Sequence, residues 1–220
     1  MAYHIDDEHT SLDDLRRRIE ETDLVPSRVS LLDEIAEKFG VLEQQGITTL
    51  AGLRKALKSS GRLAALSTET GIETQYLTLL RREIESYFPK PSPLKDFDWI
   101  PEGVIAKLEG SGIRDTAGLY QATSSSEDIT NLAQSSGVGT AILEVFACLA
   151  DLSRVQWVSP ATARMLVEAG YPSSASLAAA DSGELCDALM RVNADGRFFK
   201  GKIGLRDVRR LIRAAGYIGS

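Results

Sequence analysis

The stretch LEGSGIRDTAGL at residues 108–119 decides the fold, because a close copy of it, LEQQGITTLAGL, occurs 66 residues earlier at residues 42–53. The two stretches share Leu, Gly, Ile, Ala, Gly and Leu at the same spacing. The same shift superposes three further pairs: Leu66 on Leu132, Gly71 on Gly137 and Leu77 on Leu143. Similarity at a fixed period indicates a repeat architecture.

A third copy follows at a shift of 58. This shift carries five residues onto equivalents, Trp99, Leu108, Gly112, Ala117 and Leu119 onto Trp157, Leu166, Gly170, Ala175 and Leu177. The second half of this copy drifts, because NADGRF at residues 193–198 replaces the glycine turn. Trp99 and Trp157 each stand where a copy begins, so we expect them to anchor the core, the alternative being a stacking or ligand-binding role.

The spacing of apolar residues predicts helices throughout. In the first copy Leu63 and Leu66, and then Leu77, Leu80 and Ile84, recur at three and four positions, and no stretch alternates as a strand would. The helices should be short and end at glycines that adopt the left-handed cap conformation, in a Schellman-type stop. The expected glycines are Gly46, Gly71, Gly112, Gly137 and Gly170.

An additional helix should precede the repeats, capped by Thr10 or Ser11, with Leu12, Leu15 and Ile19 on one face. The proline-rich PKPSP at residues 89–93 cannot continue a helix. We therefore predict an N-terminal helix plus the first helical unit at residues 1–88, a linker at 89–96, and the second and third units together at 97–220.

Composition is that of a folded protein, with 43% hydrophobic and 25% charged residues. No apolar run approaches the roughly 20 residues of a membrane helix, and the N-terminus is acidic where a secretory signal is basic and then apolar. These features predict a cytoplasmic protein. Cys148 and Cys186 lack metal-site spacing and should be reduced, buried thiols.

The sequence does not favour catalysis. It contains no nucleophile elbow, phosphate-binding loop, dinucleotide fingerprint or zinc-protease motif. Its histidines, His4 and His9, both precede Thr10, so the folded part lacks the commonest general base. We predict a non-enzymatic protein with no cofactor and no metal.

The stretch SSGVGTAILEVF at residues 135–146 resembles a helix-hairpin-helix element, whose Gly-apolar-Gly turn presents backbone N–H groups at a helix start and can hold a phosphate. The equivalent turn of the first copy carries Glu73 in place of the second glycine. Each copy has the length of a unit with two such hairpins. The expected fold is thus all-α, with three tandem double-hairpin units and the extra N-terminal helix.

The chain also resembles the bacterial family known as domain of unknown function 4332. The resemblance rests on ADLSRVQWVSPATARMLVEAGYPSSASLAAADSGELCDAL at residues 150–189 and on the preceding Thr-Gly-Ile and Ser-Gly-Val turns. It extends from about Leu31 to the end of the chain. The family brings no catalytic residues to transfer, so the resemblance supports the fold and leaves the function open.

Charge is distributed unevenly. The net charge is −6, but residues 190–220 hold eight basic residues against two aspartates, which makes this segment +6 and the remainder −12. The segment includes Lys200 and Lys202. Arg206, Arg209, Arg210 and Arg213 follow the i, i+3, i+4, i+7 spacing of one helix face. This face could be solvated, could pair with acidic residues of its own chain, or could bind a partner.

Two binding functions remain open. A nucleic-acid contact would combine this arginine face with the turn residues Ser136, Gly137, Gly139 and Thr140. An acidic protein partner is the alternative, and it is favoured by the acidic remainder of the chain and by the surface that tandem repeats offer.

Overall fold

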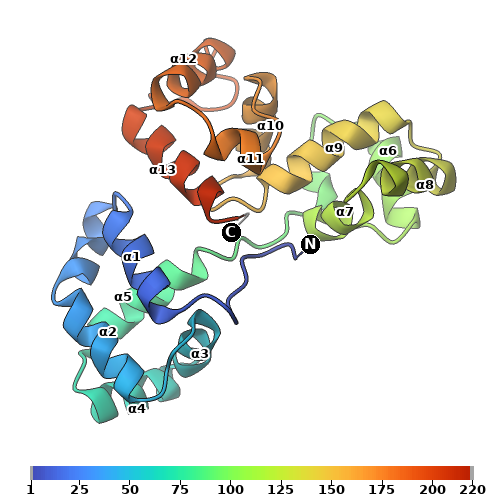
Figure 1. The fold of residues 1–220 in the computed structure, drawn as a ribbon. Helices are drawn as coiled ribbons and strands as arrows, with labels where there is room; N and C mark the ends of the chain where they lie inside the picture. Colours follow the sequence, from blue (N-terminus) through green and yellow to red (C-terminus); the bar gives the residue numbers. More distant parts are fainter. Residues whose placement is uncertain (1, 219–220) are drawn as a thin grey trace. The chain divides into compact units, whose positions relative to one another are not determined.

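The computed structural model describes residues 2–218, and these residues form helices joined by turns, with isolated bridges but no β-strand (Figure 1). The expectation of an all-α protein is therefore confirmed for this part of the chain. The chain divides into two compact units. We call residues 6–88 the N-terminal unit, and residues 2–5 with 89–218 the C-terminal unit.

The N-terminal unit is built around helix α5, whose Leu77, Leu80 and Ile84 are fully buried. Of the two expected caps of α1, Thr10 and Ser11, the structure uses Ser11, whose hydroxyl accepts the Asp14 N–H at 3.1 Å. The helices are α1 (Leu12–Glu21), the 3-10 helix η1 (Pro26–Leu32), α2 (Ile35–Gln44), α3 (Leu50–Ala56), α4 (Ser60–Thr70) and α5 (Thr74–Glu85).

The C-terminal unit has one continuous apolar core that runs from Leu94 to Ile218. Figure 1 shows α9 connecting the α6–α8 part of this unit with the α10–α13 part. The helices are η2 (Leu94–Asp96), α6 (Glu102–Gly110), α7 (Thr116–Ala122), α8 (Ser126–Ser136), α9 (Thr140–Leu152), α10 (Pro160–Glu168), α11 (Ser174–Ala178), α12 (Ser182–Val192) and α13 (Leu205–Gly216).

The helix boundaries follow the sequence repeat. A shift of 66 carries α3 and α4 onto α7 and α8 residue for residue, and it carries the first residue of α5 onto that of α9. A shift of 58 carries α6 onto α10. The fourth helix of each group packs on the second and third, which are α5 on α3 and α4, α9 on α7 and α8, and α13 on α11 and α12. Helix α13 begins at Leu205, seven residues later than this shift would place it, because a loop precedes it.

The predicted turn glycines all have positive φ, between 67° and 92°. They use two different caps. After Gly46, Gly112 and Gly170 the next residue donates its N–H back to the helix, as Ile113 does to the Leu108 carbonyl at 3.0 Å, which is the Schellman bond. At Gly71 and Gly137 only the glycine N–H bonds to the helix, so these two turns have the simpler left-handed cap and not the expected Schellman form.

The segment predicted as a linker at residues 89–96 is partly integrated into the C-terminal unit. Leu94 is fully buried, and its N–H donates to the Arg114 carbonyl at 3.0 Å. The first residues of the chain belong to the same unit, because Tyr3 shares a 2.7 Å hydrogen bond with the Thr116 hydroxyl. Buried Arg154 also donates to the Tyr3 carbonyl, at 2.9 Å. No helix in residues 2–218 is both long and apolar enough to cross a membrane.

Candidate functional site

The turn between α8 and α9 contains four of the residues predicted to bind a partner. Gly137 is the left-handed cap of α8, and Gly139 is the cap residue before α9. The Ser136 hydroxyl donates to the Leu132 carbonyl at 2.6 Å and accepts the Val138 N–H at 3.2 Å, while Val138 is buried. The Ser136 hydroxyl and the buried Val138 side chain thus fix the turn to the unit, while Gly137, Gly139 and Thr140 are exposed.

The start of α9 presents backbone donors to solvent. Its first helical hydrogen bonds are donated by Ile142 and Leu143 to the Gly139 carbonyl, so the N–H groups of residues 139–141 have no helical acceptor. Gly139 lies at φ −63° and ψ 142°, a conformation open to any residue, and nothing lies within 4 Å of where its Cβ would stand. The backbone therefore does not require glycine at position 139. Because glycine has no side chain, it leaves the N–H groups at the start of α9 uncovered.

A lysine from α6 brings positive charge to this turn. Lys107 is exposed, and its Nζ donates to the Gly137 carbonyl at 3.0 Å. The helix dipole adds partial positive charge at the start of α9. Open amides, a helix start and an ammonium group together form a site that can attract an anion. Lys107 was not among the residues predicted from the sequence. Its equivalent in the first copy is Val41, and this difference between the copies is the signal that could have indicated it.

Helix α13 carries the predicted arginine face. Arg206, Arg209 and Arg213 are exposed, and Val208 and Ala215 are buried on the opposite side. The remaining predicted residues differ in their surroundings. Lys200 and Lys202 are exposed in the loop before α13, and Arg210 is half-buried, with its guanidinium carbon 4.6 Å from the centre of the Trp157 ring.

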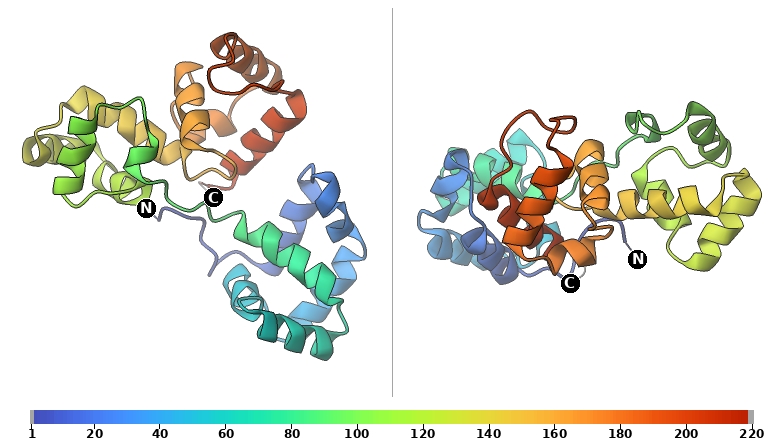
Figure 2. Two further views of the ribbon diagram at one scale, coloured as in Figure 1. Left: turned by 180° about the vertical axis from the view of Figure 1, so that it is seen from behind. Right: turned by 90° about the horizontal axis from the view of Figure 1, so that it is seen from above.

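The structure does not bring the α8–α9 turn and the arginine face together. Figure 2 shows the turn at the far end of α9, whereas α13 lies with α11 and α12 beyond the other end of that helix. A single phosphate cannot therefore touch both. They are two separate candidate sites of the C-terminal unit, and a ligand would have to extend along α9 to meet both.

A groove beside α13 was not foreseen. It has a volume of about 220 Å³ and is lined by Trp157, Phe199, Lys202 and Arg210 over an aliphatic floor. Trp157 was expected to anchor the core, but its side chain is 43% exposed and its φ is 68°. Its equivalent Trp99 does pack on the core, edge to face with Phe97 at 5.3 Å. The expectation was wrong for Trp157 because its strained backbone turns the ring outward.

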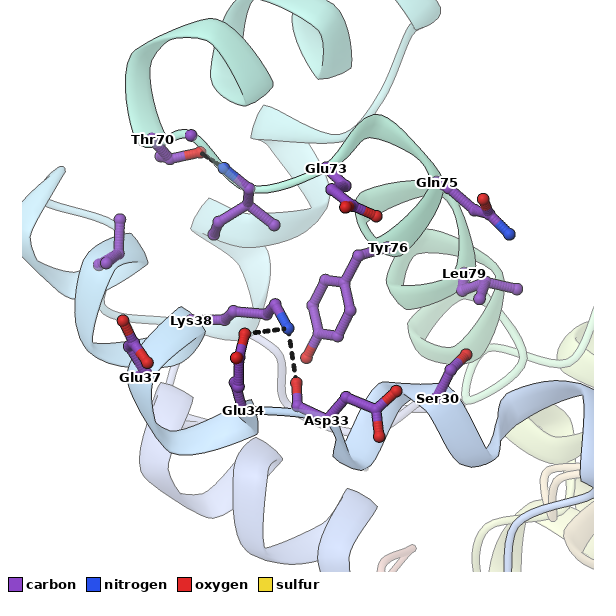
Figure 3. A pocket seen from close by; sticks show the side chains of 13 residues that line it. Ser30, Asp33, Glu34, Glu37, Lys38, Thr70, Glu73, Gln75, Tyr76 and Leu79 are labelled. Carbon is purple, nitrogen blue, oxygen red and sulfur yellow. Dashed lines mark hydrogen bonds and ion pairs between the residues drawn. The ribbon is translucent and has the colours of Figure 1, made fainter.

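A larger pocket, of about 760 Å³, lies in the N-terminal unit beside the turn equivalent to the α8–α9 turn (Figure 3). Its walls carry the carboxylates of Asp33, Glu34, Glu37 and Glu73. Lys38 is the one basic residue of its lining, and the Nζ donates to the Asp33 carbonyl at 2.6 Å and to Glu34 at 3.2 Å. The surplus of negative charge makes this pocket unfavourable for phosphate.

Tyr76 lines this pocket, and Figure 3 shows its ring beside the Lys38 ammonium group, which lies 4.6 Å from the ring centre. The hydroxyl donates to the Leu31 carbonyl at 3.0 Å. Burial, with a further contribution from the charge of Asp33, raises the pKa of Tyr76 well above its ordinary value. The phenol therefore stays protonated and is a structural donor.

We next considered whether the described part of the chain has residues grouped for metal binding or for thiol chemistry. No group of three or more His, Cys, Asp or Glu residues there is arranged to hold a metal ion. Cys186 is buried and Cys148 is half-buried, both as free thiols. Burial raises the pKa of the Cys148 thiol, and nearby Asp151 adds to the shift, so its reactive thiolate is disfavoured.

Comparison with known proteins identifies the family. The family model described as domain of unknown function 4332 matches residues 100–217, which span α6 to α13 and thus the second and third copies of the repeat. The match is narrower than the expected resemblance from about Leu31. None of the curated proteins and none of the solved structures matches the chain. The matched segment covers more than half of the chain, which therefore belongs to the family of domain of unknown function 4332.

Proposed function

We propose that this protein is a non-enzymatic binding protein of the helix-hairpin-helix type, and that its α8–α9 turn contacts the phosphate backbone of a nucleic acid. The three groups of helices would then be tandem double-hairpin units. The observation that carries the proposal is the unobstructed start of α9, where Gly139 leaves backbone amides open and Lys107 adds an ammonium group.

The first copy provides an internal comparison. Glu73 has nearly the same backbone conformation as Gly139, φ −58° and ψ 136°, and it also stands before the fourth helix of its group. The same local fold therefore tolerates a side chain. In the first copy that side chain is a carboxylate, and Val41 replaces Lys107. The first copy thus lacks the lysine, and it has a negative charge at the position where the second copy has a glycine without a side chain.

The arginine face of α13 would contribute at longer range. Residues 197–218 contain seven basic residues and one aspartate, so this segment is strongly positive, and one of its arginines, Arg197, pairs with Glu168. A charged surface of this kind raises the rate of encounter with a polyanion without a direct contact. Contacts to phosphate give affinity that is largely independent of sequence, so we expect little preference between DNA sequences.

The test is a titration of fluorescein-labelled duplex and single-stranded DNA by fluorescence anisotropy at several salt concentrations. Binding should weaken steeply with salt, with a slope that reports the number of phosphates neutralised. Gly139→Glu should reduce the affinity about tenfold or more, because it places a carboxylate over the amides and blocks charge-assisted hydrogen bonds. Lys107→Gln should lower the salt slope by about one.

The matched control is Gly61→Glu in α4. It adds the same charge to the N-terminal unit at an exposed position with nothing within 4 Å of its Cβ. It should leave binding close to that of the parent, and circular dichroism should be the same for all three variants. Equal losses from Gly139→Glu and Gly61→Glu, or no binding by the parent at low salt, would refute the proposal.

A further inference from the structure

The groove beside α13 combines two exposed aromatic rings with an aliphatic floor. Phe199 is 52% exposed and Trp157 is 43% exposed, and both line the groove. Met165, Leu189, Val208 and Leu211 form its floor. The volume of 220 Å³ is about seven times the ~30 Å³ that a water molecule occupies in the liquid, so the groove can hold one large side chain.

The edge of this groove is basic. Lys202 and Arg210 line it, against one carboxylate, Asp207. Arg210 is held over the Trp157 ring at 4.6 Å, and its Nε is buried without a hydrogen-bond partner in the described part of the chain. The guanidinium has further N–H groups besides the buried Nε, and a carboxylate is the acceptor that pairs with them best.

The backbone presents Trp157 at a cost. A residue other than glycine at φ 68° is strained by roughly 1–2 kcal/mol. Val155 and Val158 on either side are buried and fix the segment, so the ring cannot relax into the core. Phe199 is fixed separately, because the Asn193 side chain accepts its N–H at 3.1 Å and donates to its carbonyl at 2.7 Å.

We propose that this groove is a docking site for an acidic segment of a partner protein, which inserts one aromatic or large aliphatic side chain between Trp157 and Phe199 and places neighbouring carboxylates on Lys202 and Arg210. The charge complementarity selects an acidic partner. The aliphatic floor selects an apolar anchor over a nucleobase, because a base would bury polar edges against Met165 and Leu189 without hydrogen-bond partners. The proposal is independent of phosphate binding by the α8–α9 turn.

The test uses defined peptides and the full chain. Four blocked hexapeptides separate charge from anchor: EDEFDE, EDEADE, QNQFNQ and KRKFKR. The chain has two tryptophans, so ¹H–¹⁵N spectra show two indole N–H signals, and the Trp157→Gly variant assigns them. EDEFDE should shift the Trp157 signal and leave the Trp99 signal in place. EDEADE and QNQFNQ should each bind at least tenfold more weakly, and KRKFKR should not bind.

Variants of the groove provide the controls. Trp157→Gly removes the ring and suits the positive φ, so it should abolish EDEFDE binding while the helical content stays unchanged. Lys202→Glu should weaken EDEFDE binding at least tenfold. Lys200→Glu makes the same change of charge at an exposed residue outside the groove lining, and it should weaken binding less than threefold.

Three results would overturn the docking proposal. They are equal binding of EDEFDE and EDEADE, equal effects of Lys202→Glu and Lys200→Glu, and a Trp157 signal that responds to oligo-dT but not to EDEFDE. The last result would assign the groove to a nucleobase. Gly139→Glu and Lys107→Gln should leave EDEFDE binding unchanged, so that failure of the turn as a phosphate site and failure of the groove as a docking site are distinguishable.

Discussion

Replacement of Gly112 by valine tests whether the turns of this fold depend on the left-handed conformation of their glycines. Gly112 has φ 85°, and nothing lies within 4 Å of the position its Cβ would take. The Cβ atom therefore meets no neighbour, and we expect the loss of stability to arise from the backbone conformation. The left-handed region costs an ordinary residue about 1–2 kcal/mol, and a β-branched residue is the least suited to it. We expect the free energy of unfolding to fall by about 2 kcal/mol.

Gly110 is the control, because it is the last residue of α6, two residues away, and also has nothing within 4 Å of its Cβ position. Its φ is helical, so Gly110→Ala should raise the free energy of unfolding by about 0.5–1 kcal/mol. The two variants should thus differ by about 2.5–3 kcal/mol, or roughly a hundredfold in the unfolding equilibrium.

The assay is urea unfolding followed by tryptophan fluorescence. Both tryptophans, Trp99 and Trp157, lie in the C-terminal unit, so the signal reports this unit even if the two units unfold separately. The midpoint should shift without a change in the slope of the transition. Equal stability of Gly112→Val and the parent would show that the turn relaxes to another conformation, and it would refute the assignment of these glycines as obligatory caps.

Two further predictions concern the domain boundary and alkaline pH. Trypsin cuts poorly before proline, so Pro91→Ala should create a fast cleavage site at exposed Lys90, while Lys95, next to fully buried Leu94, should be cut more slowly. Preferential cleavage within residues 6–88 or beyond residue 96 would contradict a boundary after residue 88. The pKa of Tyr76 is raised on folding, so its contribution to stability is present below the ordinary tyrosine pKa of about 10 and is lost as pH rises above it, because only the unfolded chain releases the proton. Tyr76 lies in the N-terminal unit, so urea unfolding at pH 8 and pH 11 is followed by far-UV circular dichroism. It should show a smaller loss of stability for Tyr76→Phe than for the parent, and an equal loss would contradict the assignment.

The helical framework could be predicted from the sequence because its determinants are local. A glycine that follows a run of helically spaced apolar residues can end the helix, and Gly46, Gly71, Gly112, Gly137 and Gly170 do so at the expected places. The caps at Gly71 and Gly137 could not be distinguished in advance. In these two turns a preceding hydroxyl, of Thr70 or Ser136, accepts the amide that the Schellman form would return to the helix. Ser111 also precedes a turn glycine, but its hydroxyl donates to the Lys107 carbonyl and accepts no such amide.

The groove beside α13 could not be predicted, because it depends on contacts between residues far apart in the sequence. Trp157 occupies the repeat position of Trp99, so its pattern indicated a core residue. Its positive φ cannot be inferred from a tryptophan, since only glycine signals that conformation. The loop that carries Phe199 is fixed by Asn193, and this contact follows no periodic pattern.

The repeat shows why a shared backbone does not imply a shared ligand. Glu73 and Gly139 adopt nearly the same φ and ψ, so packing does not dictate which residue stands at the start of the fourth helix. Because packing does not fix the residue type at this position, the residue there can differ between copies according to the ligand that each copy binds. In the third copy the loop before α13 shifts the start of the fourth helix and places Phe199 and Lys202 beside Trp157. Binding preference in each copy should therefore be set by this junction and not by the helical core, which predicts that exchanging the 137–140 and 71–74 segments would transfer charge preference without unfolding either unit.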